Sequence, residues 1–144
     1  MAHARKQIRD SIVTAISGNP GVTVEASRAY PALQSQMPIY LVYTTRDFVD
    51  ESMSTANGRM RVCTVVIDAL IAATEADVDD TLDEHAVYIE SQLNDSRLGG
   101  VVLKTILQES ELTVNTEGDV GLGILTLTYS VTYRTVPADP ETFA

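Results

Sequence analysis

The sequence is poor in cysteine, and its single thiol belongs to Cys63. One thiol cannot form an intramolecular disulfide or supply the several cysteines of a structural zinc site. Glycine and proline are also scarce, with eight and five among 144 residues. This content excludes collagen-like and linker-like chains and indicates a globular fold. We therefore expect packing, or contact with partners, to stabilise the protein.

The sequence is also poor in positively charged residues. The chain has 10 Lys and Arg against 20 Asp and Glu, for a formal net charge of −10. Such a charge repels phosphate backbones and argues against general nucleic-acid binding. Long apolar runs are missing too, since no stretch approaches the roughly 18 uncharged residues that span a membrane. The first residues also lack the apolar region of a signal peptide, so we expect a soluble protein made in the cytosol, with no membrane partner.

Two segments carry apolar residues at helical spacing, and a chain of 144 residues corresponds to one domain. The first pattern predicts a helix that ends at the turn-forming residues 18–21. The second predicts a helix over residues 78–94, with a capping box from Thr74 to Asp77. The stripes consist of Ala4, Ile8, Ile12, Ala15 and Ile16, and of Val78, Leu82, Ala86, Ile89 and Leu93.

The rest of the chain reads as strands. They are predicted at residues 22–26, 39–45, 60–72, 101–113 and 122–135, with a loop between Pro31 and Pro38 and a hairpin turn at 115–119. Residues 122–135 alternate between apolar and polar, whereas residues 60–72 are apolar on both faces and need cover on both. We expect the helices to provide one cover and another subunit to provide the other. The predicted fold is α+β, a single domain over residues 1–144 in which two helices pack on one face of a mostly antiparallel sheet.

Acidic residues gather within ten positions at the start of the second predicted helix. Their spacing does not match a calcium-binding loop, so we predict no metal site. Carboxylates at a helix start are favoured by the helix dipole, which makes a solvated helix end one reading and an electronegative contact face the other. The residues are Glu75, Asp77, Asp79, Asp80, Asp83 and Glu84.

No arrangement of side chains predicts catalysis, and we expect neither enzymatic activity nor a cofactor. Cys63 lies among valines as an inert filler, and His85 flanks the apolar stripe of the second helix as a boundary residue. No serine stands in a nucleophile-elbow sequence. Asp68 alone interrupts a buried-looking run, so it is predicted to be exposed or to form an ion pair across the sheet. The candidate partners are Arg59, Arg61 and Arg134.

Three cations, Arg5, Lys6 and Arg9, stand at the start of the first helix, where the helix dipole disfavours positive charge. One reading is a solvated helix face. The other is self-association, in which these cations contact the acidic segment of another copy. Its predicted carboxylates are Asp79, Asp80 and Asp83.

Residues 46–59 are predicted to form a partner-binding loop, because they are too long for an ordinary hairpin turn. Phe48, Val49 and Met53 give apolar anchors, and Asp50 and its acidic neighbours give a polar surround. A mobile loop with no role is the alternative. The flanking strands outreach the second helix, at roughly 43 Å for 60–72 against roughly 25 Å for 78–94, and so predict a projecting arm.

The chain resembles the tail terminator family of long-tailed bacteriophages, which includes the lambda-like minor tail protein U group and its tail-completion relatives. The resemblance covers nearly the whole chain. It lies in the order and length of the predicted elements and in the general pattern of their residues. Four segments carry it: HARKQIRDSIVTAISG, MPIYLVYTTRD, RVCTVVIDALIAATEADVDDTLDEHAVYIESQL and LTYSVTYRTVPADPETF.

This resemblance implies an α/β fold, a hexameric ring and a place in the virion at the head-proximal end of the tail, after assembly in the host cytoplasm. Such a ring caps the tail tube, ends its polymerisation and provides the docking surface for the head-tail connector. Its partners are the tail tube protein and the connector or neck protein, and DNA passes through the channel without specific binding. The family implies no catalytic residues. The alternatives are a neck or head-tail joining protein, and a small acidic ligand-binding domain or enzyme.

Overall fold

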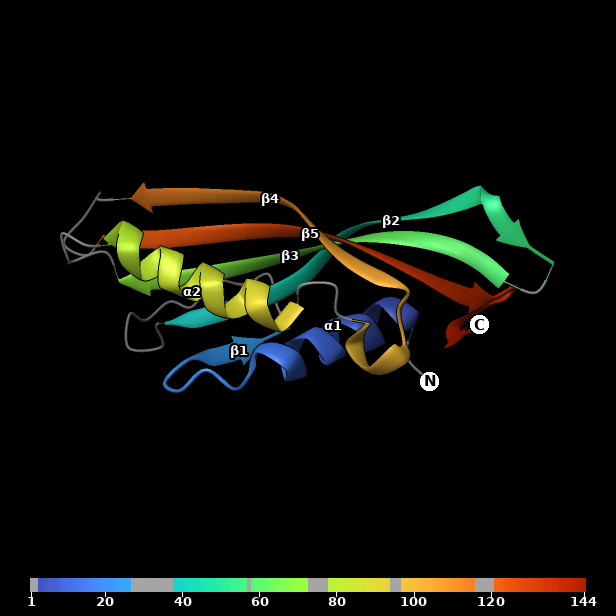
Figure 1. Ribbon diagram of the computed structural model, residues 1–144, viewed down its shortest axis with the longest axis horizontal. Coiled ribbons are helices and arrows are strands. Elements are labelled where there is room, and N and C mark those ends of the chain that lie inside the picture. The colour runs from blue at the N-terminus through green and yellow to red at the C-terminus, as the bar shows by residue number, and fades with distance from the viewer. Residues whose placement is uncertain (1–2, 27–37, 57, 73–77, 94–96, 116–120) are drawn as a thin grey trace.

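The computed structural model describes residues 3–26, 38–56, 58–72, 78–93, 97–115 and 121–144. Six strands form one sheet in the order β1-β2-β3-β5-β4, with β6 paired to β5 (Figure 1). The β1–β2 pair is parallel and all other pairs are antiparallel. The elements are α1 (Ala4–Ile16), β1 (Thr23–Glu25), β2 (Ile39–Thr55), β3 (Gly58–Ala72), α2 (Val78–Leu93), the 3₁₀ helix η2 (Leu98–Gly100), β4 (Lys104–Asn115), β5 (Leu122–Val136) and β6 (Asp139–Phe143).

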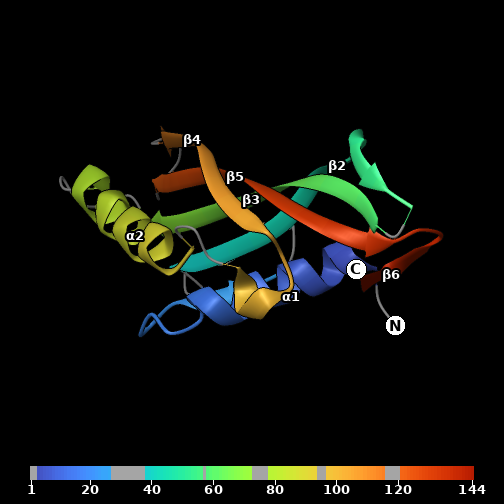
Figure 2. The ribbon, with the colours of Figure 1, turned by 45° about the vertical axis from the view of Figure 1, so that its right-hand side comes forward.

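Both helices cover the same face of the sheet (Figure 2), which confirms the predicted α+β architecture. The predicted stripes are the buried sides of the helices, because Ile8, Ile12, Leu82 and Ile89 are fully buried. They pack on side chains of β2, β3 and β5 in one hydrophobic core. None of the helices that the structure describes is long and apolar enough to cross a membrane.

The alternation predicted for β5 is also confirmed, since every second residue from Gly123 to Thr135 is buried. Gly123 has a packing role. A Cβ atom there would lie 2.9 Å from Cγ2 of Val78 and 3.0 Å from Cγ1 of Ile71. Glycine therefore lets the start of α2 lie close to the end of the sheet.

The second face of β3 is buried within the single chain, as the two-sided apolar pattern predicts. Leu70 packs there with Ile39 and Leu41, so another subunit is not needed to cover this end of the strand. Asp68 lies on the same face and is only 2% exposed.

The prediction of an exposed Asp68 is wrong, and the candidate partners Arg59, Arg61 and Arg134 lie at the far end of the β3–β5 pair. Its carboxylate accepts hydrogen bonds from the hydroxyls of Tyr43, at 2.9 Å, and Thr126, at 2.8 Å. Thr126 stands directly opposite Asp68 on β5. Hydrogen-bond donors from both neighbouring strands therefore offset the free energy needed to bury this carboxylate.

The prediction of a loop at residues 46–59 is also wrong, because most of these residues belong to strands. β2 continues to Thr55 and β3 begins at Gly58, with these two residues paired. We call residues 46–56 and 58–64 the β2–β3 arm. Figure 1 shows its end reaching beyond both helices, so an arm does project, but residues predicted as a loop form its end. Pairing with β3 stabilises a segment whose many polar residues indicate a loop.

A bulge at the base of the arm changes which side chains face the helices. The register shifts between Thr44 and Arg46, so one extra residue is inserted into β2. After the shift, Asp47 pairs with Cys63 and faces α1.

Several predictions lie outside the described residues. These are the capping box at Thr74, the acidic residues Glu75 and Asp77, most of the loop between Pro31 and Pro38, and most of the hairpin turn before β5.

Candidate functional site

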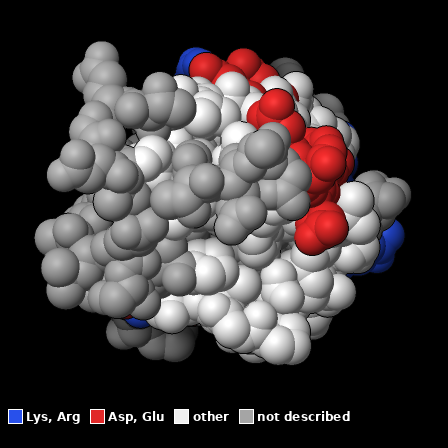
Figure 3. Space-filling view, turned by 90° about the vertical axis from the view of Figure 1, so that its left-hand side faces the viewer, with Lys and Arg blue, Asp and Glu red and all other residues white. Residues whose placement is uncertain are grey.

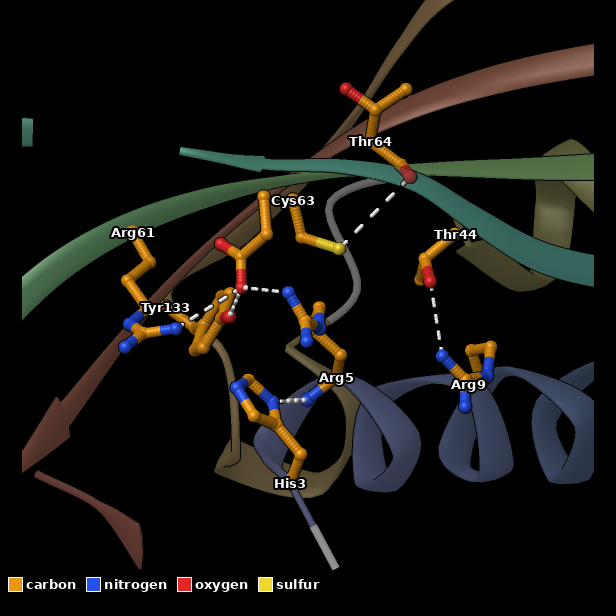
Figure 4. Close-up of polar contacts among 9 residues, drawn as sticks. His3, Arg5, Arg9, Thr44, Arg61, Cys63, Thr64 and Tyr133 are labelled. Atoms are coloured by element: carbon orange, nitrogen blue, oxygen red, sulfur yellow. Dashed lines mark hydrogen bonds and ion pairs between the residues drawn. The ribbon is translucent and has the colours of Figure 1, made fainter. Parts of the chain in front are cut away.

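The start of α1 meets the arm at the buried carboxylate of Asp47, whose side chain is 2% exposed. Its Oδ2 accepts a hydrogen bond of 2.6 Å from the Tyr133 hydroxyl. The same oxygen lies 3.2 Å from Nη1 of Arg61 and 3.4 Å from Nη1 of Arg5 (Figure 4). Groups from β3, β5 and α1 thus converge on one carboxylate of β2. Charge-assisted contacts of this kind fix the arm against the helix.

The surroundings of Asp47 keep its neighbours in defined protonation states. Burial raises the pKa of Tyr133, and the hydrogen bond to Asp47 raises it further. Burial also raises the pKa of Cys63 to about 12, so the thiol stays protonated at neutral pH. This agrees with the prediction of an inert filler, because the thiolate is the reactive form. His3 has a pKa lowered by burial and by Arg5, and its Nδ1 accepts a hydrogen bond from the Arg5 N–H at 3.1 Å.

A cavity of about 310 Å³ opens between α1 and the base of the arm, and we call it the basic pocket. Nη1 of Arg9 donates a hydrogen bond to the Thr44 hydroxyl at 3.0 Å. The Arg46 guanidinium lies 5.9 Å from the centre of the Phe48 ring. Three arginines therefore line the pocket against one carboxylate. The lining residues are Arg5, Arg9, Thr44, Thr45, Arg46 and Asp47.

The structure separates the three cations predicted for self-association. Arg5 and Arg9 line the basic pocket. Lys6 instead points to solvent, where it forms an exposed ion pair of 2.7 Å with Asp10. Arg46 was missed by sequence reasoning, because only the pairing of β2 with its distant partners brings it next to α1.

The predicted acidic residues lie at the other end of the molecule, since α2 begins at the end opposite to the start of α1 (Figure 1). Asp79, Asp80, Asp83 and Glu84 are all exposed. In the view of that end, Asp and Glu form a run along one side of the face (Figure 3). No group of three or more potential metal ligands occurs among the described residues.

The predicted partner-binding residues lie on the β2–β3 arm, in the part of β2 that follows Asp47. Phe48 is 47% exposed and Met53 58%, and Val49 and Asp50 are also partly accessible. A second apolar surface lies on β4, the opposite edge of the sheet from β1. There Leu112 and Val114, which pair with Leu125 and Gly123 on the helix-covered face, are 43% and 41% exposed, whereas Ile106 pairs with Ser130 on the other face and is 39% exposed.

His85 fixes α2 to β2, in agreement with its prediction as a boundary residue. Its Nδ1 lies 2.5 Å from the Tyr40 hydroxyl, and that hydroxyl accepts a hydrogen bond from the Asn19 amide at 2.9 Å. Burial lowers the pKa of His85 and so favours the neutral ring, whose unprotonated Nδ1 accepts a hydrogen bond from the Tyr40 hydroxyl. The chain of hydrogen bonds joins α2, β2 and the turn after α1.

A second cavity, of about 410 Å³, lies between α2 and the sheet. Tyr129 reaches it from β5, and its buried hydroxyl has no hydrogen-bond partner among the described residues. Burial and the nearby Glu90 carboxylate raise the pKa of this phenol, which therefore stays protonated at neutral pH. The cavity is lined by Val87, Glu90, Ser91, Leu107 and Tyr129.

No protein-family model matches the chain, and no curated protein matches it in sequence. Among solved structures, it is similar to a chain from the virion of a native gene transfer agent particle, with a TM-score of 0.46 and 17% sequence identity. The alignment covers 90% of this chain and 92% of that chain. A likeness at this level assigns neither family nor function, so membership of the tail terminator family stays a prediction.

Proposed function

We propose that this chain is a structural virion protein whose copies form a ring on the head-proximal end of a tail tube. The ring ends tube polymerisation and provides the docking surface for the head-tail connector. The observation that carries this proposal is the β2–β3 arm, which reaches past the helices with exposed apolar side chains. A paired hairpin that extends beyond the core and exposes Phe48 and Met53 is suited to contact another protein.

A closed ring requires two different contact surfaces on each subunit. The two ends of this molecule provide them. One end carries the arm and the basic pocket, and the other carries the acidic start of α2 together with the end of β4 (Figure 1). Because the two surfaces differ, copies joined through them associate head to tail, and such a contact forms a ring where the rotation between neighbouring copies closes.

The net charge of −10 supports a channel through which DNA passes. A predominantly acidic wall repels the phosphate backbone and prevents tight binding of the duplex during its passage. The resemblance of the sequence to tail terminators supports the same role.

The proposal is tested by imaging the purified protein alone and mixed with tails that lack heads, using antibody labelling to locate it. A ring on one end of the tube supports the proposal. Label on connectors, with bare tube ends, contradicts it and favours a neck or head-tail joining protein.

A further inference from the structure

We infer that the basic pocket binds carboxylates on the start of α2 from a second copy of this chain. The inference rests on the proposed ring and names one of its contacts. The Arg5 and Arg61 guanidinium groups share one oxygen of Asp47, and neither Arg9 nor Arg46 has a carboxylate partner among the described residues. The pocket therefore has an excess of positive charge in a protein that is acidic overall.

The guanidinium groups of the pocket keep free donors. Arg9 uses one of its N–H groups on the Thr44 hydroxyl, and Arg5, whose side chain is 42% exposed, makes a long contact of 3.4 Å with Asp47. A guanidinium presents five N–H donors and binds a carboxylate through two parallel hydrogen bonds. An incoming carboxylate thus finds unused donors on two side chains one helical turn apart.

The start of α2 supplies matching carboxylates. Asp79 and Asp83, like Asp80 and Glu84, stand four residues apart on one helix, where like charges repel. The helix dipole favours charges in the first turn, which holds Asp79 and Asp80, and its effect weakens for the next two. No ion pair relieves this repulsion among the described residues. A cation from outside the chain would therefore stabilise this end of the helix.

Contact between these surfaces must be intermolecular, because they lie at opposite ends of the molecule (Figure 1). The partner is a second copy, since the chain itself presents the complementary surface and its net charge of −10 opposes a nucleic acid. The apolar arm next to the pocket, and the apolar end of β4 near the start of α2, allow the same contact to bury hydrophobic side chains.

Charge reversal tests the inference by sedimentation of the purified protein in low-salt and physiological buffers. We expect Arg9→Glu and Asp83→Arg each to weaken self-association at least about tenfold, because each places like charges together. The double variant should recover most of this loss, since it restores an opposite-charge pair. Arg9 and Asp83 suit the test because neither contacts Asp47.

Two controls make the result specific. Lys104→Glu has the same change of charge as Arg9→Glu on the exposed start of β4, and should have little effect. Arg9→Glu combined with Glu25→Arg, at an exposed residue of β1 on the opposite edge of the sheet from β4, restores the net charge without the predicted pair, and should not recover association. Circular dichroism and melting of each variant separate lost contact from lost folding.

Several results would overturn the inference. One is a double variant no better than its weaker single variant, and another is an Arg9→Glu variant that associates as the Lys104→Glu control does. Duplex DNA binding that Arg9→Glu abolishes would assign the pocket to phosphates instead. If the wild type forms rings but the charge swap fails, only this contact is wrong. If the wild type neither associates nor binds tails, the proposed function itself is wrong.

Discussion

The burial of Asp47 shows how single residues determine the shape of this protein. Oδ2 of its carboxylate accepts a hydrogen bond from the Tyr133 hydroxyl and contacts the guanidinium groups of Arg5 and Arg61. Oδ1 has no hydrogen-bond partner among the described residues. A buried carboxylate is tolerated only when charges and donors surround it. These partners come from three separate elements, so Asp47 links the arm, the sheet and α1.

Two tyrosines of β5 allow a matched test of this role. Tyr133 donates a hydrogen bond to Asp47, whereas the equally buried hydroxyl of Tyr129 has no partner among the described residues. Tyr133→Phe should lower the free energy of unfolding by about 1.5–3 kcal/mol, the usual value for a hydrogen bond to a charged group. Tyr129→Phe should leave it unchanged or raise it by up to about 1 kcal/mol, because it removes an unsatisfied polar group. Urea denaturation measures both, and equal losses would contradict this account.

His85 makes stability depend on pH. Burial lowers its pKa in the folded protein below the ordinary value of 6.5, despite the opposing effect of Glu84. The unfolded chain therefore binds the proton more readily. The contribution of His85 to stability is complete above pH 6.5 and decreases as the pH falls toward the folded-state pKa. Protonation also removes the acceptor of the Tyr40 hydroxyl.

We expect the wild type to lose stability more steeply than His85→Asn between about pH 7.5 and about pH 5.5. The asparagine keeps an oxygen that accepts from Tyr40 but does not titrate. Denaturation curves at several pH values measure the difference. Parallel losses in the two proteins would show that His85 is not the titrating group. His3, whose folded-state pKa is also lowered, is present in both and cancels in the comparison.

At the scale of elements, the sequence predicted most clearly what depends on local periodicity. The two helices have the predicted buried stripes, and β5 has the predicted alternation. Residues 46–59 of the arm were predicted as a loop and not as strand, because the bulge after Thr44 breaks the alternation and the polar residues have low strand propensity. Its strands form through pairing with β3 and docking on Asp47, neither of which is visible in a local window. β6, which contains Pro140, was missed for the same reason.

The arm should affect assembly without affecting folding. Replacing Phe48 and Met53 together with serine removes its most exposed apolar side chains, and surface changes alter stability by only about 0.5 kcal/mol each. The variant should melt nearly as the wild type does, yet fail to form rings or cap tails. Leu103→Ser, at a side chain that is 47% exposed and lies outside both proposed contact surfaces, is the control and should assemble normally. Normal capping by the arm variant would show that the contact surface lies elsewhere.

For the whole molecule, the distribution of charge matters more than its total. The acidic composition excluded general nucleic-acid binding, but it did not reveal that arginines gather at one end and carboxylates at the other (Figures 1 and 3). Sequence reasoning found both clusters because each lies on one helix. It could not find Arg46 and Asp47, which join the basic cluster only through long-range strand pairing. The candidate site was therefore predictable in its helical parts and unpredictable in its strand part.

The central claim is that copies of this chain form a ring that caps a tail tube. Electron microscopy of tails assembled with and without the protein, in the absence of heads, tests it most directly. We expect tubes of uniform length with a ring on one end when the protein is present, and tubes of variable, often excessive length when it is absent. Identical tube lengths in the two samples, with a protein that stays monomeric at high concentration and leaves both tube ends bare, would contradict the claim.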